Sequence, residues 1–155
     1  MQKRLKGLQK SAVKYLGAEA NDKHFKLIFL DIGLGQRLAG LQSKDVMEDP
    51  LRSYEGRLAE QFVGQQLLAE SDTASEDRQL YYWKRQKKCS TAEVDFLLVR
   101  DGHIIPVEVK SGKSGSLKSL HLYLSKYGGQ GLCLQETNEI KTLANITFLP
   151  LCTIL

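Results

Sequence analysis

The chain has few cysteines and no long apolar run. Its three cysteines, Cys89, Cys133 and Cys152, are widely spaced and form no CxxC pair. We expect such thiols to be reduced and to pack as small apolar groups rather than to form a disulfide framework. No apolar stretch is long enough to cross a bilayer, and the basic N-terminus has no apolar signal core. Together these absences predict a cytoplasmic protein.

The signatures of three common kinds of site are also missing. His24, His103 and His121 lack the local spacing of a structural zinc site, and no nucleophilic Cys or Ser triad is indicated. The sequence Gly112-Lys113-Ser114 matches the end of a P-loop, but a P-loop needs a further glycine at position 107, which is a valine. The sequence therefore predicts neither a zinc site nor an ATP-binding P-loop.

Acidic residues are absent from two basic segments. Hydrophobic residues make up 42% and charged residues 26% of the 155 positions, which is typical of one soluble globular domain. The net charge is +4, but residues 78–88 and 109–135 contain no Asp or Glu and carry Arg78, Lys84, Arg85, Lys87, Lys88, Lys110, Lys113, Lys118 and Lys126. Such segments suit a polyanion, although a solvated basic face is the commoner explanation for each one.

The strongest local pattern lies in residues 92–111, AEVDFLLVRDGHIIPVEVKS. Two strand-like apolar runs flank Asp101-Gly102, a pair that tolerates the positive φ of a two-residue hairpin turn. Counting outward from this turn places Asp95 directly opposite Glu108. Because directly opposed like charges destabilise a sheet, the register indicates that these carboxylates serve a purpose other than stability.

The opposed carboxylates suit a divalent cation. Mg²⁺ prefers oxygen ligands and usually takes one or two carboxylates, with waters and substrate phosphates completing its shell. Strand alternation places Lys110 on the same face as Glu108, where its ammonium group could orient an attacking water. The alternative interpretation is a solvated hairpin face on which charges alternate by chance.

Alternation also assigns faces to the two strands. Val107 and Val109 are predicted to point away from Glu108. On the other strand Asp95 is predicted to share its face with Glu93, while Val94, Phe96 and Leu98 point to the opposite side.

Apolar periodicity predicts the remaining elements. Helices are expected over residues 1–16, from 32 to about 39, over 51–70 and over 116–127; strands are expected over 24–30, 80–87, 131–135 and 146–151. Asp31 is predicted to cap the second helix, and Gly128-Gly129 to end the fourth. Residues 1–50 are expected to form a basic helix with a strand and short helix that pack on a core of residues 51–155. Together they would form one compact domain.

Glu60 lies beside the apolar stripe of the predicted helix 51–70, with Gly56 and Gly64 one turn before and after it. A glycine within a helix costs about 1 kcal/mol relative to alanine, so this pair predicts close approach by another backbone. Glu60 is therefore a candidate third acid for the hairpin site, although a lone helical glutamate is more often solvated.

These residues resemble a known family. Glu60, Asp95 and the tripeptide Glu108-Val109-Lys110 resemble the PD-(D/E)XK nuclease superfamily. More narrowly, FKLIFLDIGL, GRLAEQFV, YYWKRQ, AEVDFLL and IPVEVKSGK are similar to the uncharacterised C-terminal domain of many bacterial and archaeal AAA-type ATPases. The resemblance covers most of the chain, from about Phe25 onward. Because those ATPases carry a P-loop, the chain is expected to be a fragment of a larger ATPase or a stand-alone remnant.

The resemblance implies a fold and a set of roles. The fold would be α/β, with a restriction-endonuclease-like αβββαβ core and a mixed central sheet flanked by helices. Asp95 and Glu108 would bind Mg²⁺ or Mn²⁺, with the backbone of Val109 as a further ligand. Lys110 would assist the nucleophilic water and Glu60 would complete the acidic cluster. The expected contacts to nucleic acid are Lys84, Arg85, Lys113 and Lys118.

Three functions follow as hypotheses. The leading one is a metal-dependent nuclease-like domain that hydrolyses phosphodiester bonds of nucleic acid, most readily DNA. The second is a non-catalytic module that binds DNA or a protein and regulates an AAA-type ATPase. The third, with less support, is a purely structural or oligomerisation domain.

Overall fold

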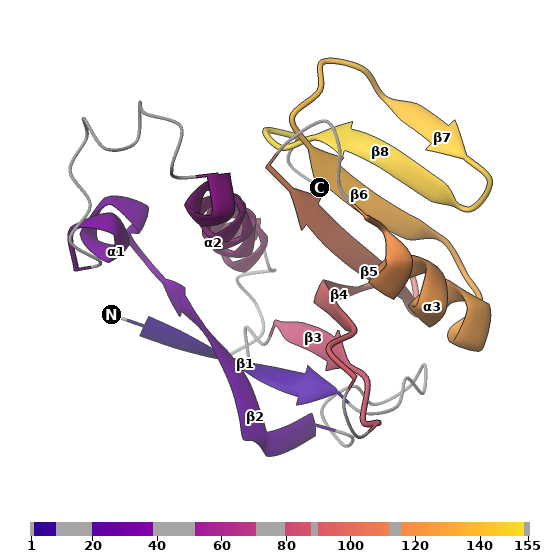
Figure 1. Cartoon of the computed structure of the whole chain (residues 1–155), viewed down its shortest axis with the longest axis horizontal. Helices are drawn as coiled ribbons and strands as arrows, with labels where there is room; N and C mark the ends of the chain where they lie inside the picture. The colour runs from indigo at the N-terminus through magenta and orange to yellow at the C-terminus, as the bar shows by residue number, and fades with distance from the viewer. Residues whose placement is uncertain are drawn as a thin grey trace.

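A computed structural model of the chain describes residues 2–8, 20–38, 52–70, 80–87, 90–111 and 116–153. In chain order the elements are β1 (Gln2–Leu8), β2 (Ala20–Phe29), α1 (Ile32–Leu38), α2 (Arg52–Glu70), β3 (Tyr81–Lys84), β4 (Glu93–Arg100), β5 (His103–Lys110), α3 (Lys118–Tyr127), β6 (Gly131–Gln135), β7 (Lys141–Leu143) and β8 (Ile146–Pro150). The described strands form one mixed sheet in the order β2-β1-β3-β4-β5-β6-β8-β7 (Figure 1).

The hairpin of β4 and β5 confirms the predicted turn. Asp101 and Gly102 have φ angles of 52° and 75°, the left-handed conformation that a two-residue primed turn requires. The strands pair from Arg100 with His103 to Phe96 with Val107. The register counted from the sequence is therefore correct over these pairs.

The elements from α2 to β6 follow the predicted order αβββαβ. Strands β3, β4 and β5 are antiparallel neighbours, and α3 crosses over so that β6 lies parallel to β5. Figure 1 shows α2 and α3 on different sides of the sheet. The predicted α/β architecture, a mixed central sheet flanked by helices, is confirmed.

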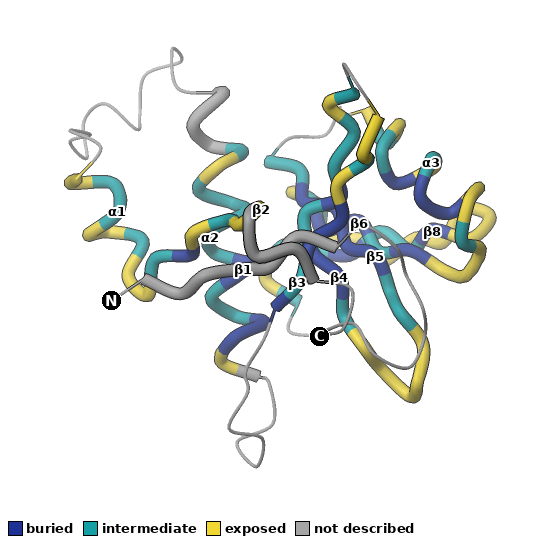
Figure 2. Tube along the Cα trace, turned by 90° about the horizontal axis from the view of Figure 1, so that it is seen from below, coloured by how far each residue is buried: buried dark blue, intermediate teal, exposed yellow. Residues whose placement is uncertain are grey.

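Two apolar clusters join the sheet to its helices. The α2-side cluster connects α2 with strand residues and contains Ile28, Val63, Leu67, Leu68, Leu80, Tyr82, Phe96, Val107, Val109, Leu134 and Leu149. The α3-side cluster contains Trp83, Val94, Leu97, Leu120, Tyr123, Leu124, Cys133 and Ile146. Figure 2 shows buried segments in the central strands and in α2 and α3, whereas α1 has none.

Helix α2 approaches the sheet closely at Gly64. A Cβ atom added there would lie 2.8 Å from Cδ1 of Ile28 and 3.2 Å from Cζ of Phe96, whereas one added at Gly56 would lie 3.6 Å from Oγ of Ser111. The expectation that another backbone approaches both glycines is wrong, because these neighbouring atoms belong to side chains. Only Gly64 is tightly enclosed.

The predicted helix over residues 1–16 is wrong where the chain is described, because residues 2–8 form β1. This strand pairs antiparallel with β2 and parallel with β3, so both of its edges make backbone hydrogen bonds. Such pairing outweighs the weak helix preference of a segment rich in lysine and leucine. Residues 9–16, the expected joint at 43–50 and the polar loop at 71–79 lie outside the described residues.

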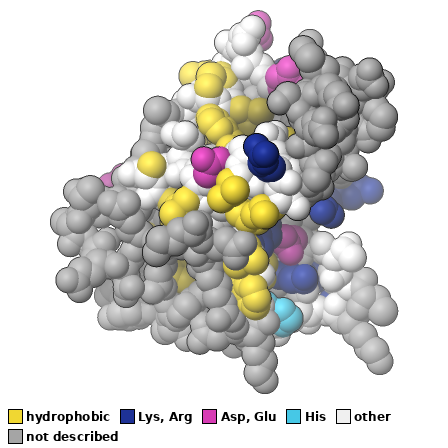
Figure 3. Space-filling view, turned by 90° about the vertical axis from the view of Figure 1, so that its left-hand side faces the viewer, with side chains coloured by type: hydrophobic (Ala, Val, Ile, Leu, Met, Phe, Trp, Pro, Cys, Tyr) yellow, Lys and Arg dark blue, Asp and Glu magenta, His cyan; other side chains and the backbone are white. Residues whose placement is uncertain are grey.

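The short helix α1 follows β2 as predicted. The backbone N–H of Leu34 donates to Oδ1 of Asp31 at 2.8 Å, which confirms Asp31 as the cap. Exposed hydrophobic side chains gather on β2 and α1, on the face seen in Figure 3: Phe25, Leu27, Leu30, Leu34 and Leu38. Among the described helices, none has the length and apolar character needed to cross a membrane.

Candidate functional site

The candidate site lies where the backbone pairing of β4 and β5 ends. The last pair of the hairpin ladder is Phe96 with Val107, so the predicted pairing of Asp95 with Glu108 is not part of the ladder. On its other edge β4 pairs with β3, where Leu97 pairs with Tyr81 and Val94 pairs with Trp83. Two residues of β4, Asp95 and Phe96, therefore lie opposite the single residue Tyr82. This arrangement is a β-bulge, which bends a strand and redirects its side chains.

The bulge overturns one predicted face assignment. Strict alternation placed Val94, Phe96 and Leu98 on the same side. In the structure Val94 belongs to the α3-side cluster, whereas Phe96 and Leu98 pack with the α2-side cluster. Because one extra residue of β4 is inserted at the bulge, the alternation changes by one position there.

Asp95 lies at this bulge and contacts two other strands. Its Oδ2 accepts a hydrogen bond from the backbone N–H of Val109 at 2.9 Å. Its Oδ1 lies 3.4 Å from Nζ of Lys26 on β2. The Asp95 carboxylate therefore accepts the β5 N–H that a backbone carbonyl of β4 would accept in a regular ladder. It also faces the ammonium group of Lys26 on β2.

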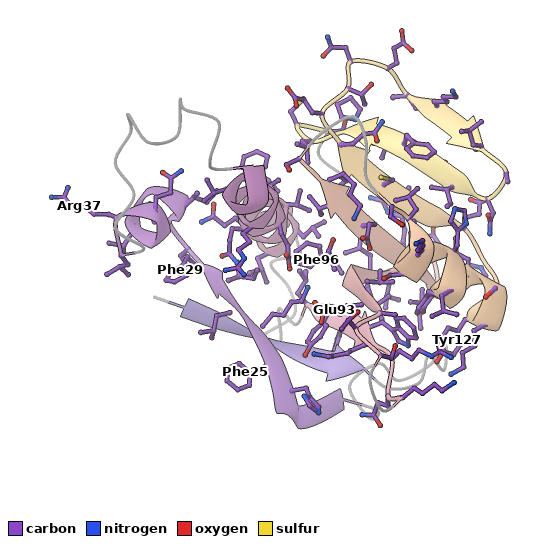
Figure 4. The ribbon with its side chains drawn as sticks, viewed as in Figure 1. Phe25, Phe29, Arg37, Glu93, Phe96 and Tyr127 are labelled. Atoms are coloured by element: carbon purple, nitrogen blue, oxygen red, sulfur yellow. The ribbon has the colours of Figure 1, made fainter. Side chains whose placement is uncertain are left out.

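Lys26 joins three carboxylates from two further elements. Its Nζ lies 2.7 Å from Oε1 of Glu60 on α2, 2.7 Å from Oε1 of Glu93 on β4 and 3.4 Å from Oδ1 of Asp95. It also lies 5.1 Å from the centre of the Tyr82 ring, within cation–π range. Figure 4 labels Glu93 on β4, in the middle of the molecule.

The charges around Lys26 outweigh the effect of its burial. Burial alone would lower the pKa of Lys26, but Asp95, Glu60 and Glu93 together raise it above the ordinary value. Burial raises the pKa of Glu60, and the nearby Lys26 only partly offsets this. The predicted link between Glu60 and Asp95 is therefore made through Lys26, which the sequence analysis did not identify. Its only signal was a charged residue inside the apolar segment HFKLIFL.

Glu108 lies in a more buried part of the site. Its neighbours Val107 and Val109 pack in the α2-side cluster, so alternation places Glu108 on the other face, next to its β6 partner Cys133. Its Oε1 lies 2.7 Å from Nζ of Lys110, which shares its face of the strand as alternation predicted. Its Oε2 is buried and has no hydrogen-bond partner among the described residues.

This environment raises the pKa of Glu108 to about 7, first through burial and then through the charge of Asp95, against the opposing effect of Lys110. The same burial raises the pKa of the Cys133 thiol to about 11. Cys133 is therefore a protonated core thiol at neutral pH, and Lys110 only partly offsets the burial of the Glu108 carboxylate. Asp95 connects the two ion-pair groups, since it contacts Lys26 and acts electrostatically on Glu108.

The predicted nucleic-acid contacts are distributed around this centre. Lys84 is exposed and lies 3.7 Å from Oε2 of Glu93. Arg85 is half-buried, and its backbone N–H donates to the carbonyl of Ala92. Lys118 is exposed at the start of α3, close to Ser119, whose hydroxyl accepts the backbone N–H of Glu93 at 3.3 Å. Lys113 lies outside the described residues.

Asp95 and Glu108 are the residues that could hold a divalent cation. As the side chains lie, no group of three or more His, Cys, Asp and Glu in the described ranges is arranged to hold a metal. Asp95 and Glu108 nevertheless offer two carboxylates, and the buried Oε2 of Glu108 has no hydrogen-bond partner among the described residues. Two carboxylates are enough for Mg²⁺, which keeps several of its waters.

Two clefts among the described residues lie away from the acids. One of about 500 Å³ lies between the β4–β5 turn and the end of α3, lined by residues that include Arg100, His103 and Tyr127. Another of about 200 Å³ lies between β2, α1 and α2, at Phe29 and Gln61.

Comparison with protein-family models gives one match, to a domain of unknown function, DUF4143, over residues 55–154. The chain belongs to this family. DUF4143 domains are found C-terminal to AAA-type ATPases, which confirms the narrower resemblance seen in the sequence. No curated protein and no solved structure matches the chain. The DUF4143 match contains Glu60, Glu93, Asp95, Glu108 and Lys110, whereas Lys26 precedes it.

Proposed function

We propose that this DUF4143 domain hydrolyses phosphodiester bonds in nucleic acid, most readily DNA, with the help of Mg²⁺ or Mn²⁺. The observation that carries the proposal is the buried, unpaired Oε2 of Glu108, next to the charge of Asp95 and the ammonium group of Lys110. A cation between the two carboxylates would relieve their repulsion and the cost of burying Glu108. The order αβββαβ, with Glu60 on the first helix and Glu108-Val109-Lys110 on the third strand, resembles the PD-(D/E)XK nucleases.

Each residue then has a chemical role. Asp95 and Glu108 would hold the cation, together with the carbonyl oxygen of Val109, because the N–H of Val109 is already bonded to Asp95. When bound, the cation would acidify a water and stabilise the leaving oxygen. Lys110 would orient the water and offset charge on the phosphate. The exposed ammonium groups of Lys84 and Lys118 would hold backbone phosphates on either side.

The proposal is tested by cleavage of linear, nicked and branched DNA in Mn²⁺. We expect the wild type to cleave at least one of these substrates. Asp95→Ala should abolish cleavage, and Lys110→Ala should slow it by about 10²-fold or more, the usual contribution of a positioned proton-transfer group. Glu139→Gln, at an exposed acid after β6, is the control and should cleave normally. Absence of wild-type cleavage with every divalent metal, or unchanged rates in both site variants, would reject the proposal.

A second candidate is a non-catalytic module that regulates an AAA-type ATPase. The observation that favours it is that each of the four acids already lies within 3.4 Å of a lysine ammonium, Glu60, Glu93 and Asp95 at Lys26 and Glu108 at Lys110. This candidate predicts salt-dependent DNA binding without cleavage, unchanged in Asp95→Ala. Catalytic cleavage by the wild type would exclude it.

A further inference from the structure

Two positions for positive charge flank the Asp95 carboxylate. On the Oδ1 side, Nζ of Lys26 is surrounded by oxygens of Glu60, Glu93 and Asp95. Beyond Oδ2 lies β5, where Glu108 has a side chain that is 93% buried and an Oε2 without a partner. Two-metal phosphodiesterases hold two divalent ions in one acidic centre, where the ions stabilise the attacking and leaving oxygens.

In this chain the first of these positions is filled by a side chain. The Lys26 side chain is only 16% exposed, and the ring of Tyr82 lies 5.1 Å from its ammonium group. The two carboxylate oxygens at 2.7 Å are as close as charge-assisted hydrogen bonds allow. A divalent ion could enter only by displacing this ammonium group from all three acids.

We propose that Lys26 is a built-in cation of the acidic centre, which takes the place of a second divalent ion among Glu60, Glu93 and Asp95, so that the centre binds one metal ion. The proposal rests on the proposed function for the single ion at Asp95 and Glu108. It assigns Lys26 a positioning role, because its ammonium group acts through Asp95 and Glu60 rather than on the substrate.

The sequence position of Lys26 supports this assignment. All four acids lie within the DUF4143 match, whereas Lys26 is on β2, before the match begins. The charge that compensates Glu60, Glu93 and Asp95 is thus supplied by a strand at the edge of the described sheet. A family domain with these acids and a neutral residue in place of Lys26 would need another cation at this position.

The test is the number of Mn²⁺ ions bound per chain, measured by isothermal titration calorimetry on the full chain. We expect one ion for the wild type and two for Lys26→Met, which keeps the apolar length of the side chain but removes the charge. Lys84→Met is the matched control, because it removes another lysine that pairs with Glu93 but is exposed, and it should bind one ion. Adding Glu60→Gln to Lys26→Met should return the number to one.

The outcomes separate this inference from the proposed function. Two ions on the wild type, or equal numbers for the wild type and a folded Lys26→Met, would overturn the role of Lys26. If Lys26→Met does not fold without metal, recovery of its circular dichroism in Mn²⁺ supports the inference, and failure to recover overturns it. No ion on the wild type but one on Lys26→Met would reject the metal site at Asp95 and Glu108 while upholding Lys26 as the cation. No ion on either protein would reject both.

Discussion

Substitution of Glu108 tests whether its buried carboxylate destabilises the folded chain in the absence of metal. The pKa of this residue is raised from the ordinary 4.5 to about 7 in the folded chain. Between these two pH values the folded state keeps a proton on Glu108 that the unfolded state has released. The contribution of Glu108 to the unfolding free energy therefore falls as the pH rises from about 4.5 to about 7. At about 1.36 kcal/mol for each tenfold change in proton affinity, the loss is roughly 3 kcal/mol.

Glu108→Gln removes this ionisation while keeping the size of the side chain. We expect the wild type to lose up to roughly 3 kcal/mol of unfolding free energy relative to Glu108→Gln between pH 4.5 and pH 8. Urea titration in a chelator measures the difference, and fluorescence of the chain's single tryptophan, Trp83, reports unfolding because this side chain is 1% exposed. Glu60, whose pKa is also raised, is present in both proteins, so its titration largely cancels.

The control is Glu139→Gln, which makes the same substitution at an exposed acid outside the site and shows whether a change in stability belongs to position 108. Lys110 and Cys133 also adjoin Glu108, but both have pKa values raised further above this range. A difference between the wild type and Glu108→Gln that does not change with pH would refute the reasoning. So would a wild type that gains stability relative to the variant as the pH rises through 7.

Two further predictions concern packing and capping. Gly64→Ala should destabilise the chain by about 1–3 kcal/mol, because the new Cβ would overlap Ile28 and Phe96. Gly56→Ala, where the new Cβ would make only an ordinary van der Waals contact with Ser111, should instead stabilise it by roughly 0.5–1 kcal/mol. Urea midpoints compare the two, and equal effects would contradict the packing. Asp31→Ala should cost about 1 kcal/mol through loss of the α1 cap, whereas Asp31→Asn should retain most of that stability. Protection of the α1 amides from hydrogen exchange measures the difference. Identical protection in the two variants would contradict the role of the cap.

The parts of the fold that the sequence predicted correctly are those in which local chemistry decides the structure. Asp101-Gly102 permits the positive φ of a tight turn, and once that turn is fixed the pairing of β4 with β5 follows by counting. The apolar stripe of α2 and the two glycines after α3 likewise required no knowledge of distant residues. For the same reason strand alternation correctly placed Lys110 on the face of Glu108, where the two side chains form an ion pair.

The features that the sequence did not predict depend on partners far along the chain. Residues 2–8 form a strand because β2 and β3 lie on either side of it, and no pattern within seven residues encodes those neighbours. The bulge at Asp95 is set by the register of β4 against β3, which reverses the expected face of Val94. Lys26 was missed because its role requires three acids that are 34 to 69 positions away.

The position of Lys26 gives the N-terminal strands a function in the site as well as in the sheet. Glu60, Glu93 and Asp95 are brought together by α2 and β4, and three like charges at this spacing would oppose folding of the domain. Lys26 of β2 supplies the compensating charge, at the cost of its own burial. Because β2 reaches the core of the domain through β1, which pairs with β3, the edge of the sheet and the acidic centre stabilise each other. Lys26, which precedes the DUF4143 match, is therefore part of the candidate site.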